Sequence, residues 1–366
     1  MENYKILVIN PGSTSTKLSL FINEKNIFTT DVFHDSSVLK TFPTINDQLD
    51  YRMEVVKNFI KENNIDLSDI AAVASRGGAC YSVISGTYEV NDKLIEDTKA
   101  AKGGLYHSSM LGVQMAKRVQ DEYGGRIFMT DPTVVDEYSD IARITGIDGI
   151  YRRAICHALN LKVVAKKYAA SINRKYEDLN LIVCHIDGGI TITAHEKGRM
   201  IDGNDGGGGD GPFTPTRMGG MAVSDIVNNL WDKSKEEMLN LCSVTGGLSN
   251  YFGTSNSDEI HKLVEQGDKK AMRVWEAMIY QVSKSIGSMS TVLKGKVDGI
   301  VLTGGLMRFK DIYELISDRC SWIAPIAVYE GEYEQEALAL GALHILKDEE
   351  KPSIYTGKPV WDGFND

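Results

Sequence analysis

The stretch that most constrains the fold is residues 5–21, because it predicts two paired strands joined by a tight turn. Apolar residues run through the first strand, and hydroxyl and apolar residues alternate in the second. The turn contains Asn10, Gly12 and Ser13, in a spacing that differs from a P-loop. A glycine lets the backbone approach an anion, and successive N–H groups form an anion-binding concavity. The stretch predicts a phosphate-binding hairpin, with an ordinary polar hairpin as the alternative.

A second stretch repeats this plan about half a chain later. Residues 180–185 predict a strand, Asp187, Gly188 and Gly189 lie in a turn, and residues 190–195 predict a hydroxyl-bearing strand. We align Asp187 with Asn10. A duplicated domain with one phosphate turn in each half explains the repeat.

Length and charge narrow the class of protein. A chain of 366 residues favours two domains, and its net charge of -10, without a basic stripe, argues against nucleic acid as a partner. No run approaches the roughly 18 apolar residues of a membrane helix, and the first residues do not resemble a secretory signal. The five cysteines are far apart and lack C-x-x-C spacing, which argues against disulfides and structural zinc. We therefore expect a cytoplasmic protein with no membrane partner.

Periodicity and turn signals place the remaining elements. Helices are expected at 49–63, 100–123, 158–176, 269–294 and 337–346, and further strands at 26–32, 70–74, 126–130, 297–302 and 323–328. The expected domains are residues 1–149 completed by a closing helix at about 338–357, then residues 150–337, and a tail at 358–366. Beyond Pro352 we expect a solvated chain.

Several polar residues follow predicted strands. Arg76 precedes two glycines at a strand end, where open α/β sheets bind ligands, and Asp131 follows another strand, where a carboxylate suits magnesium. A surface arginine and an Asp-Pro turn are the alternatives. His107 precedes a helix, as an anion contact or a cap. Thr303, Gly304 and Gly305 end a late strand, where glycine permits close approach of a nucleoside.

A glycine-rich segment at 202–220 contains Phe213, two prolines and Arg217. Because a flexible linker is more uniformly polar, this composition favours a shaped active-site loop.

Together these motifs resemble those of the actin-like ATPase superfamily. Within it, residues 10–17 (NPGSTSTK), 75–78 (SRGG), 211–217 (GPFTPTR) and 303–305 (TGG) resemble the acetokinase family, and the chain is most similar to its butyrate kinases. The resemblance spans roughly residues 5–352. It implies an α/β fold of two duplicated actin-like (ribonuclease H-like) domains with a nucleotide cleft between them.

The resemblance also implies an activity: reversible, direct in-line phosphoryl transfer from ATP to a short-chain fatty acid, giving an acyl phosphate and ADP. Butyrate or a branched relative is the expected substrate, with Mg²⁺ as cofactor and a homodimer or larger assembly as the expected state. A kinase for acetate or propionate is an alternative. A catalytically weak nucleotide-binding sensor is another.

Site residues follow from the resemblance, position by position. The implied catalytic residues are Arg76, His157, Arg217 and Asp131, and the implied carboxylate-binding residues are Arg76, His107 and Arg217. The implied nucleotide or phosphate contacts are Asn10, Ser13, Ser15, Lys17, His185, Gly188, Gly189, Thr303, Gly304 and Gly305. The implied metal contacts are Asn10, Asp131 and Glu334, where Glu334 is chosen over its neighbours Glu332 and Glu336.

Three residues depart from the family pattern. Asp187 stands where glycine is expected, and Thr216 and Met218 replace Glu and Ser around Arg217. A carboxylate beside polyphosphate is repelled unless magnesium lies between them, so a metal role for Asp187 is a hypothesis.

Overall fold

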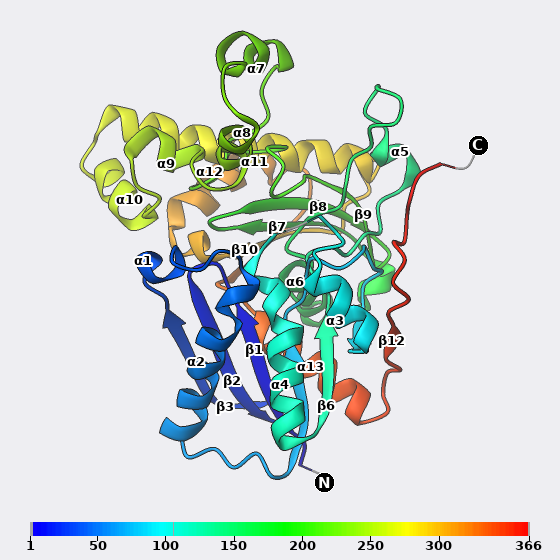
Figure 1. Cartoon of the computed structure of the whole chain (residues 1–366). Helices are drawn as coiled ribbons and strands as arrows, with labels where there is room; N and C mark the ends of the chain where they lie inside the picture. Colours follow the sequence, from blue (N-terminus) through cyan, green and yellow to red (C-terminus); the bar gives the residue numbers. More distant parts are fainter. Residues whose placement is uncertain (1–2, 105, 365–366) are drawn as a thin grey trace. The chain divides into compact units, whose positions relative to one another are not determined.

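The computed structural model describes residues 3–104 and 106–364, which form two compact units (Figure 1). The first unit comprises residues 1–136 and 333–366, and the second comprises residues 137–332. The expected domains divided instead at 149/150 and 337/338. Glu137 explains part of this difference, because its carboxylate accepts hydrogen bonds from Lys162 Nζ (2.7 Å) and Met200 N (2.8 Å) within the second unit.

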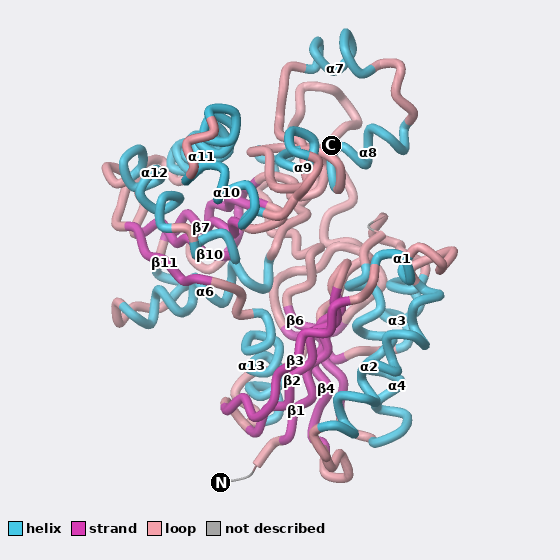
Figure 2. The backbone as a smooth tube through the Cα atoms, turned by 90° about the vertical axis from the view of Figure 1, so that its left-hand side faces the viewer, coloured by secondary structure: helices cyan, strands magenta, loops and turns pink. Residues whose placement is uncertain are grey.

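The first unit is built on a seven-stranded sheet in the order β12-β5-β6-β4-β1-β2-β3. Its strands are β1 (Lys5–Pro11), β2 (Ser15–Ile22), β3 (Lys25–Phe33), β4 (Ile70–Ser75), β5 (Thr87–Glu89), β6 (Arg126–Thr130) and β12 (Ser353–Ile354). Its helices are α1 (Ser36–Leu39), α2 (Leu49–Glu62), α3 (Asp92–Lys99), α4 (Gly112–Tyr123) and α13 (Glu334–Leu346), with short 3-10 turns η1 (Asn46–Gln48) and η2 (Ser108–Leu111). Helices α2 and α4 cover one face of the sheet, and α13 covers the other (Figure 2).

The second unit has a five-stranded sheet in the order β11-β10-β7-β8-β9. Its strands are β7 (Asn180–Ile186), β8 (Ile190–Glu196), β9 (Arg199–Gly203), β10 (Gly299–Gly304) and β11 (Ile326–Glu330). Its helices are α5 (Asp140–Arg143), α6 (Ala158–Ser171), α7 (Val223–Leu230), α8 (Lys235–Ser243), α9 (Gly247–Phe252), α10 (Ser257–Glu265), α11 (Lys269–Val292) and α12 (Lys310–Cys320), with 3-10 turns η3 (Tyr176–Asp178) and η4 (Gly305–Arg308). Helix α6 packs on β7 and β10, and α11 packs on β8.

The two sheets share a topology. In each, three antiparallel strands are followed by two parallel ones, giving β3-β2-β1-β4-β6 and β9-β8-β7-β10-β11. The duplicated plan read from the hairpins is therefore present in both units. The alignment of Asn10 with Asp187 is wrong, however, because Asn10 lies inside β1, paired with Lys17, whereas Asp187 lies in the turn after β7.

Apolar periodicity identifies the core of the second unit. Along α11 the side chains of Trp275, Met278, Val282 and Ile286 are buried, as their 3.6-residue spacing predicts. Met272 belongs to the same pattern but is 48% exposed, one turn from the start of the helix.

Among the described residues, no helix is long and apolar enough to span a bilayer.

Several expected element bounds are wrong, among them the end of the helix expected at 158–176, which stops at Ser171. The helix expected at 100–123 begins at Gly112, because Ala101 (φ 50°) and Gly104 (φ 69°) adopt conformations that a helix does not tolerate. The last helix begins at Glu334 rather than 337. Beyond Pro352 the chain is not simply solvated: β12 pairs with β5, and Val360 N donates to Ser82 O (3.1 Å). Residues 365 and 366 of the expected tail lie outside the described residues.

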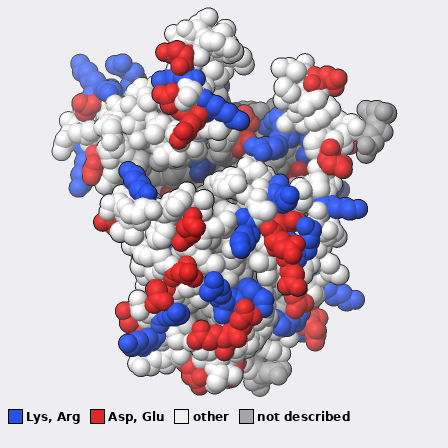
Figure 3. All heavy atoms as spheres, in the orientation of Figure 1, with Lys and Arg blue, Asp and Glu red and all other residues white. Residues whose placement is uncertain are grey.

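Charged side chains of both signs are interspersed on the face drawn in Figure 3. One buried histidine lies beside a buried cation. Thr16 Oγ1 accepts from Arg52 NH1 (3.0 Å) and shares a hydrogen bond with His34 Nε2 (2.8 Å). Burial, with the nearby Arg52 charge, lowers the pKa of His34 to about 4, and Asp31 opposes this shift.

We expect the free energy of unfolding to fall as the pH drops from about 6.5 towards 4, because the unfolded chain binds a proton that folded His34 resists. The loss at pH 4 is at most about 3 kcal/mol. Urea unfolding of His34→Gln and of the control His344→Gln at several pH values measures this. His34→Gln should have the shallower pH dependence, and equal slopes would contradict the assignment.

Candidate functional site

In the first unit, the turn after β1 presents its backbone to solvent. Gly12 N donates to Ser15 O (2.8 Å), while the N–H groups of Ser13 and Thr14 have no acceptor among the described residues. Lys17 lies on β2, and its ammonium is 3.7 Å from the Asp31 carboxylate. The turn therefore offers N–H donors and hydroxyls, while the lysine is partly neutralised.

A buried carboxylate connects three separate parts of this unit. Glu334, the first residue of α13, is 3% exposed. Its Oε2 accepts from Asn10 Nδ2 on β1 (2.7 Å) and from Arg76 NH1 after β4 (2.9 Å). The Oδ1 atom of Asn10 is buried without a partner among the described residues. The structure therefore brings Asn10, Arg76 and Glu334 together and leaves an acceptor oxygen beside them.

The glycines after Arg76 are required by close packing. A Cβ at Gly77 would overlap with the Met129 side chain, and one at Gly78 would lie 2.7 Å from Ser109 Oγ. The Arg76 backbone is in turn fixed by its N–H, which donates to Ile9 O (3.1 Å). The loop therefore has little freedom, which restricts where the guanidinium can lie.

His107 approaches the hairpin turn, with its Nε2 3.0 Å from Ser13 Oγ. Ser109 N donates to His107 Nδ1 (3.1 Å), so the proton of the neutral ring is on Nε2, facing Ser13.

Asp131 has a different environment. Its Oδ1 accepts from Ser85 Oγ (2.7 Å) and Gly86 N (2.8 Å), and it is a non-glycine residue with positive φ (38°). These bonds fix the turn before β5.

In the second unit, two imidazoles stack where β7 and β8 meet α6. The rings of His157 and His185 lie 4.1 Å apart, and Thr191 Oγ1 hydrogen-bonds to His157 Nδ1. Asn160 Nδ2 donates to His185 Nδ1 (3.0 Å) and to Thr303 Oγ1 (3.3 Å). A neutral His185 therefore carries its proton on Nε2, where it can donate a hydrogen bond.

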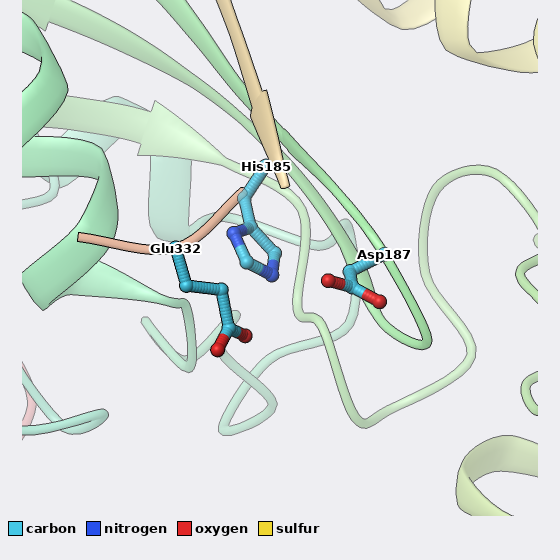
Figure 4. Close-up of side chains that lie close together, drawn as sticks. All are labelled: His185, Asp187 and Glu332. Carbon is cyan, nitrogen blue, oxygen red and sulfur yellow. The ribbon is translucent and has the colours of Figure 1, made fainter. Parts of the chain in front are cut away.

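Asp187 ties the second turn to the end of β10. Its Oδ1 accepts from Gly188 N (2.7 Å) and its Oδ2 from Gly305 N (2.7 Å). Ligand atoms of His185, Asp187 and Glu332 lie within 4.8 Å of one another (Figure 4). Because His185 is a donor in this tautomer, the carboxylates of Asp187 and Glu332 are the groups suited to Mg²⁺.

The glycine-rich segment holds Arg217 over the second turn. A Cβ at Gly189 would overlap with the Arg217 guanidinium, whose NH1 donates to Gly206 O. The Nε atom of Arg217 is buried without a partner among the described residues. Burial lowers the pKa of Arg217, and the Asp205 carboxylate opposes that shift. Arg217 is therefore a confined cation whose buried Nε donor is unpaired among the described residues.

Hydroxyls in the same loop fix its position. Thr214 Oγ1 and Thr216 Oγ1 both donate to Gly188 O, at 2.7 and 3.1 Å. The departure at Thr216 therefore serves as a contact to the turn. Met218 instead lines a cavity of about 1100 Å³ with Phe213 and residues of α7 and α11, and that cavity contains none of the histidines, Asp187 or Arg217.

Sequence reasoning missed residues that support the site. Asn160 and Thr214 hold His185 and the second turn, and Asn204 pairs with β8 by accepting from Ile192 N (2.7 Å) and donating to Ile190 O (3.0 Å). Buried Arg52 contacts the first hairpin. Each lies in a helix or loop whose local pattern gives no sign of its distant partner.

Comparisons with known proteins bear on the family and the fold. Residues 132–311 match the model of the acetokinase family. The fold is similar to that of a propionate kinase from Francisella tularensis subsp. tularensis SCHU S4 (TM-score 0.75, 20% identity, 92% of this chain and 98% of that one). It is also similar to acetate kinases from Porphyromonas gingivalis (0.74, 16%, 94% and 100%) and Entamoeba histolytica (0.73, 16%, 92% and 98%). These likenesses confirm an α/β fold of the actin-like type.

We expect Asp187→Asn to lower the free energy of unfolding by about 1–2 kcal/mol, because one acceptor oxygen becomes an amide that faces a backbone N–H. Chemical denaturation measures the change. Asp232→Asn, at an exposed residue of the same unit, is the control and should stay within about 0.5 kcal/mol of the unsubstituted protein. Equal stability of the two variants would show that the Asp187 bonds contribute little.

Proposed function

We propose that this chain is a carboxylate kinase of the acetokinase family, which transfers a phosphoryl group reversibly between ATP and a short-chain fatty acid. The observation that carries the proposal is the Arg217 site. The segment matching the acetokinase model, residues 132–311, contains Arg217, the stacked histidines and the Asp187 turn. A confined guanidinium with an unpaired donor is suited to a transferring phosphoryl group.

The reaction needs positioning more than acid–base chemistry. A carboxylate is already ionised at neutral pH, so its oxygen attacks the γ-phosphorus directly while the bond from phosphorus to ADP breaks. No proton has to move. Arginine suits both the carboxylate and the phosphoryl group because its planar fork donates two parallel hydrogen bonds. In the proposal, Arg76 and Arg217 bind these groups, with His107 near the carboxylate.

The histidines and turns have defined roles in the proposal. His157, oriented by Thr191, donates to the phosphoryl oxygens as negative charge redistributes in the transition state. His185, Gly188 and Gly189 contact nucleotide phosphate, and the Thr303–Gly305 turn receives adenosine. In the first hairpin, phosphate contacts are assigned to Ser13, Ser15 and Lys17.

Oxygen donors suited to Mg²⁺ are present. The unpartnered Asn10 Oδ1 and the Glu334 carboxylate would hold the ion in the first unit, with Asp131 as a third proposed contact. When bound, the ion neutralises phosphate charge. The carboxylates of Asp187 and Glu332 form a second group of oxygen donors, and Asp187→Gly with unchanged magnesium dependence would exclude Asp187 from metal binding.

Butyrate or a branched C4–C5 acid is the proposed substrate, because the short chain and the wording of residues 211–215 (GPFTP) resemble those of butyrate kinases. Acetate or propionate is the alternative, since one methylene changes discrimination by only about 1–3 kcal/mol. The similar folds of a propionate kinase and acetate kinases keep this alternative open. A homodimer or larger assembly remains part of the proposal.

We expect acyl phosphate, trapped with hydroxylamine, from MgATP and a panel of straight and branched C2–C6 acids. C4 or C5 acids should give the highest kcat/KM. Highest activity with C2 or C3 would establish the acetate or propionate alternative. Failure of every acid to react, with ATP binding intact by calorimetry, would favour a nucleotide-binding sensor.

We expect Arg217→Ala to reduce turnover by at least about 1000-fold while changing the affinity for ADP by less than about threefold, because its guanidinium meets the transferring group. Arg319→Ala on α12 is the matched control, since that arginine is exposed and paired with Glu276 (3.4 Å). It should keep its turnover. Undiminished turnover of Arg217→Ala would refute the assigned role.

A further inference from the structure

A fully buried arginine lies directly behind the first hairpin. Arg52, on α2, is 0% exposed. Its NH1 donates to Ser15 O and Thr16 Oγ1 (both 3.0 Å), and its NH2 approaches Ser13 O (3.5 Å). Its Nε and NH2 also donate to Gln48 Oε1 (both 3.1 Å). All these acceptors are uncharged, and three of them belong to the hairpin.

In the part of the chain that the structure describes, this guanidinium has no carboxylate partner. Among residues 3–104 and 106–364, no carboxylate lies within ion-pair distance of Arg52. Burial lowers its pKa to about 10, which still leaves it charged at neutral pH, while its neighbour His34 is neutral. Burying an unpaired charge costs several kcal/mol unless an opposite charge compensates. Something outside the described residues is therefore expected to neutralise it.

The hydrogen bonds of Arg52 also orient the turn. Because a trans peptide points its C=O and N–H in opposite directions, drawing Ser13 O inward directs the N–H of Thr14 outward. That N–H and the N–H of Ser13 are the unpartnered donors of an exposed turn. Successive outward N–H groups form an anion-binding concavity. The arginine thus lies on the inner side of the turn, and the N–H of Thr14 lies on the outer side.

Lys17, the cation that the sequence motif suggests, is less suited to be the main charge of this site. Its ammonium is partly exposed and lies 3.7 Å from Asp31, which offsets its charge. Solvent screening further weakens it, whereas a buried charge is screened little.

We propose that Arg52 is a positioning residue whose buried positive charge strengthens anion binding by residues 12–15, the hairpin that the proposed function assigns to phosphate. Arg52 acts through the hairpin, without touching the ligand. Identifying the phosphate as part of a nucleotide rests on the proposed function.

Titration calorimetry with inorganic pyrophosphate, MgADP and adenosine tests this on the full chain. Arg52→Met should bind pyrophosphate and MgADP about tenfold more weakly, because the compensating charge is gone. Adenosine affinity should be unchanged. Arg118→Met is the matched control: this arginine of α4 is 55% exposed and 3.6 Å from Asp50, and its replacement should change no affinity by more than about twofold.

A merely structural Arg52 gives a different result. In that case Arg52→Met lowers the melting temperature without anions but leaves the ratio of pyrophosphate to adenosine affinity unchanged, which would overturn the proposal. If Arg52→Met does not fold, Arg52→Lys and Arg52→Gln decide. Lysine should keep pyrophosphate affinity within about threefold and glutamine should lose about tenfold, while equal behaviour of the two would overturn the proposal.

The Arg52 binding test can succeed or fail independently of the proposed kinase activity. A chain that binds pyrophosphate in an Arg52-dependent way but forms no acyl phosphate would refute the kinase and leave the anion site standing. A chain that binds neither pyrophosphate nor MgADP would overturn the anion site directly.

Discussion

Carboxylates that join separate segments near the ends of strands, one buried and one half-buried, impose the main constraint on this structure. In the first unit, the Glu334 carboxylate connects β1, the loop after β4 and the start of α13 through Asn10 and Arg76. In the second, the Asp187 carboxylate connects the turn after β7 to the end of β10. Because a charge withdrawn from water is stabilised only by well-placed partners, each carboxylate holds its partners in a narrow range of positions. Each unit thus has a rigid polar centre at the edge of its sheet.

The confined arginines of the two units are constrained by the same cost of removing a charge from water. Arg52 and Arg217 are both confined, and neither pairs closely with a carboxylate among the described residues. The backbone carbonyls around them accept hydrogen bonds from the guanidinium groups but supply no negative charge. Both arginines lie against glycine-containing turns, one in each unit. An anionic ligand would supply the missing negative charge at such a group.

Much of the fold could be predicted because its signals are local. Alternating strands, the apolar stripe of α11 and the repeated hairpin each depend on neighbours in sequence, and the structure contains all three. Failures occurred where local patterns are weak. The helix expected from residue 100 starts at Gly112 because Ala101 adopts a positive φ, which composition does not reveal. The segment after Pro352 was expected to be solvated, yet it pairs with β5.

By itself the sequence determined the duplicated α/β plan, the turns and the residue types suited to phosphate, because strand periodicity and glycine spacing are properties of short stretches. Tertiary structure alone decided which of these residues meet. It selected Glu334, among three nearby glutamates, to contact Asn10 and Arg76, and it placed Arg52 behind a hairpin some forty residues away in sequence. Such pairings depend on packing between distant segments, where the desolvation of a charge is repaid only by the partners that the fold brings to it.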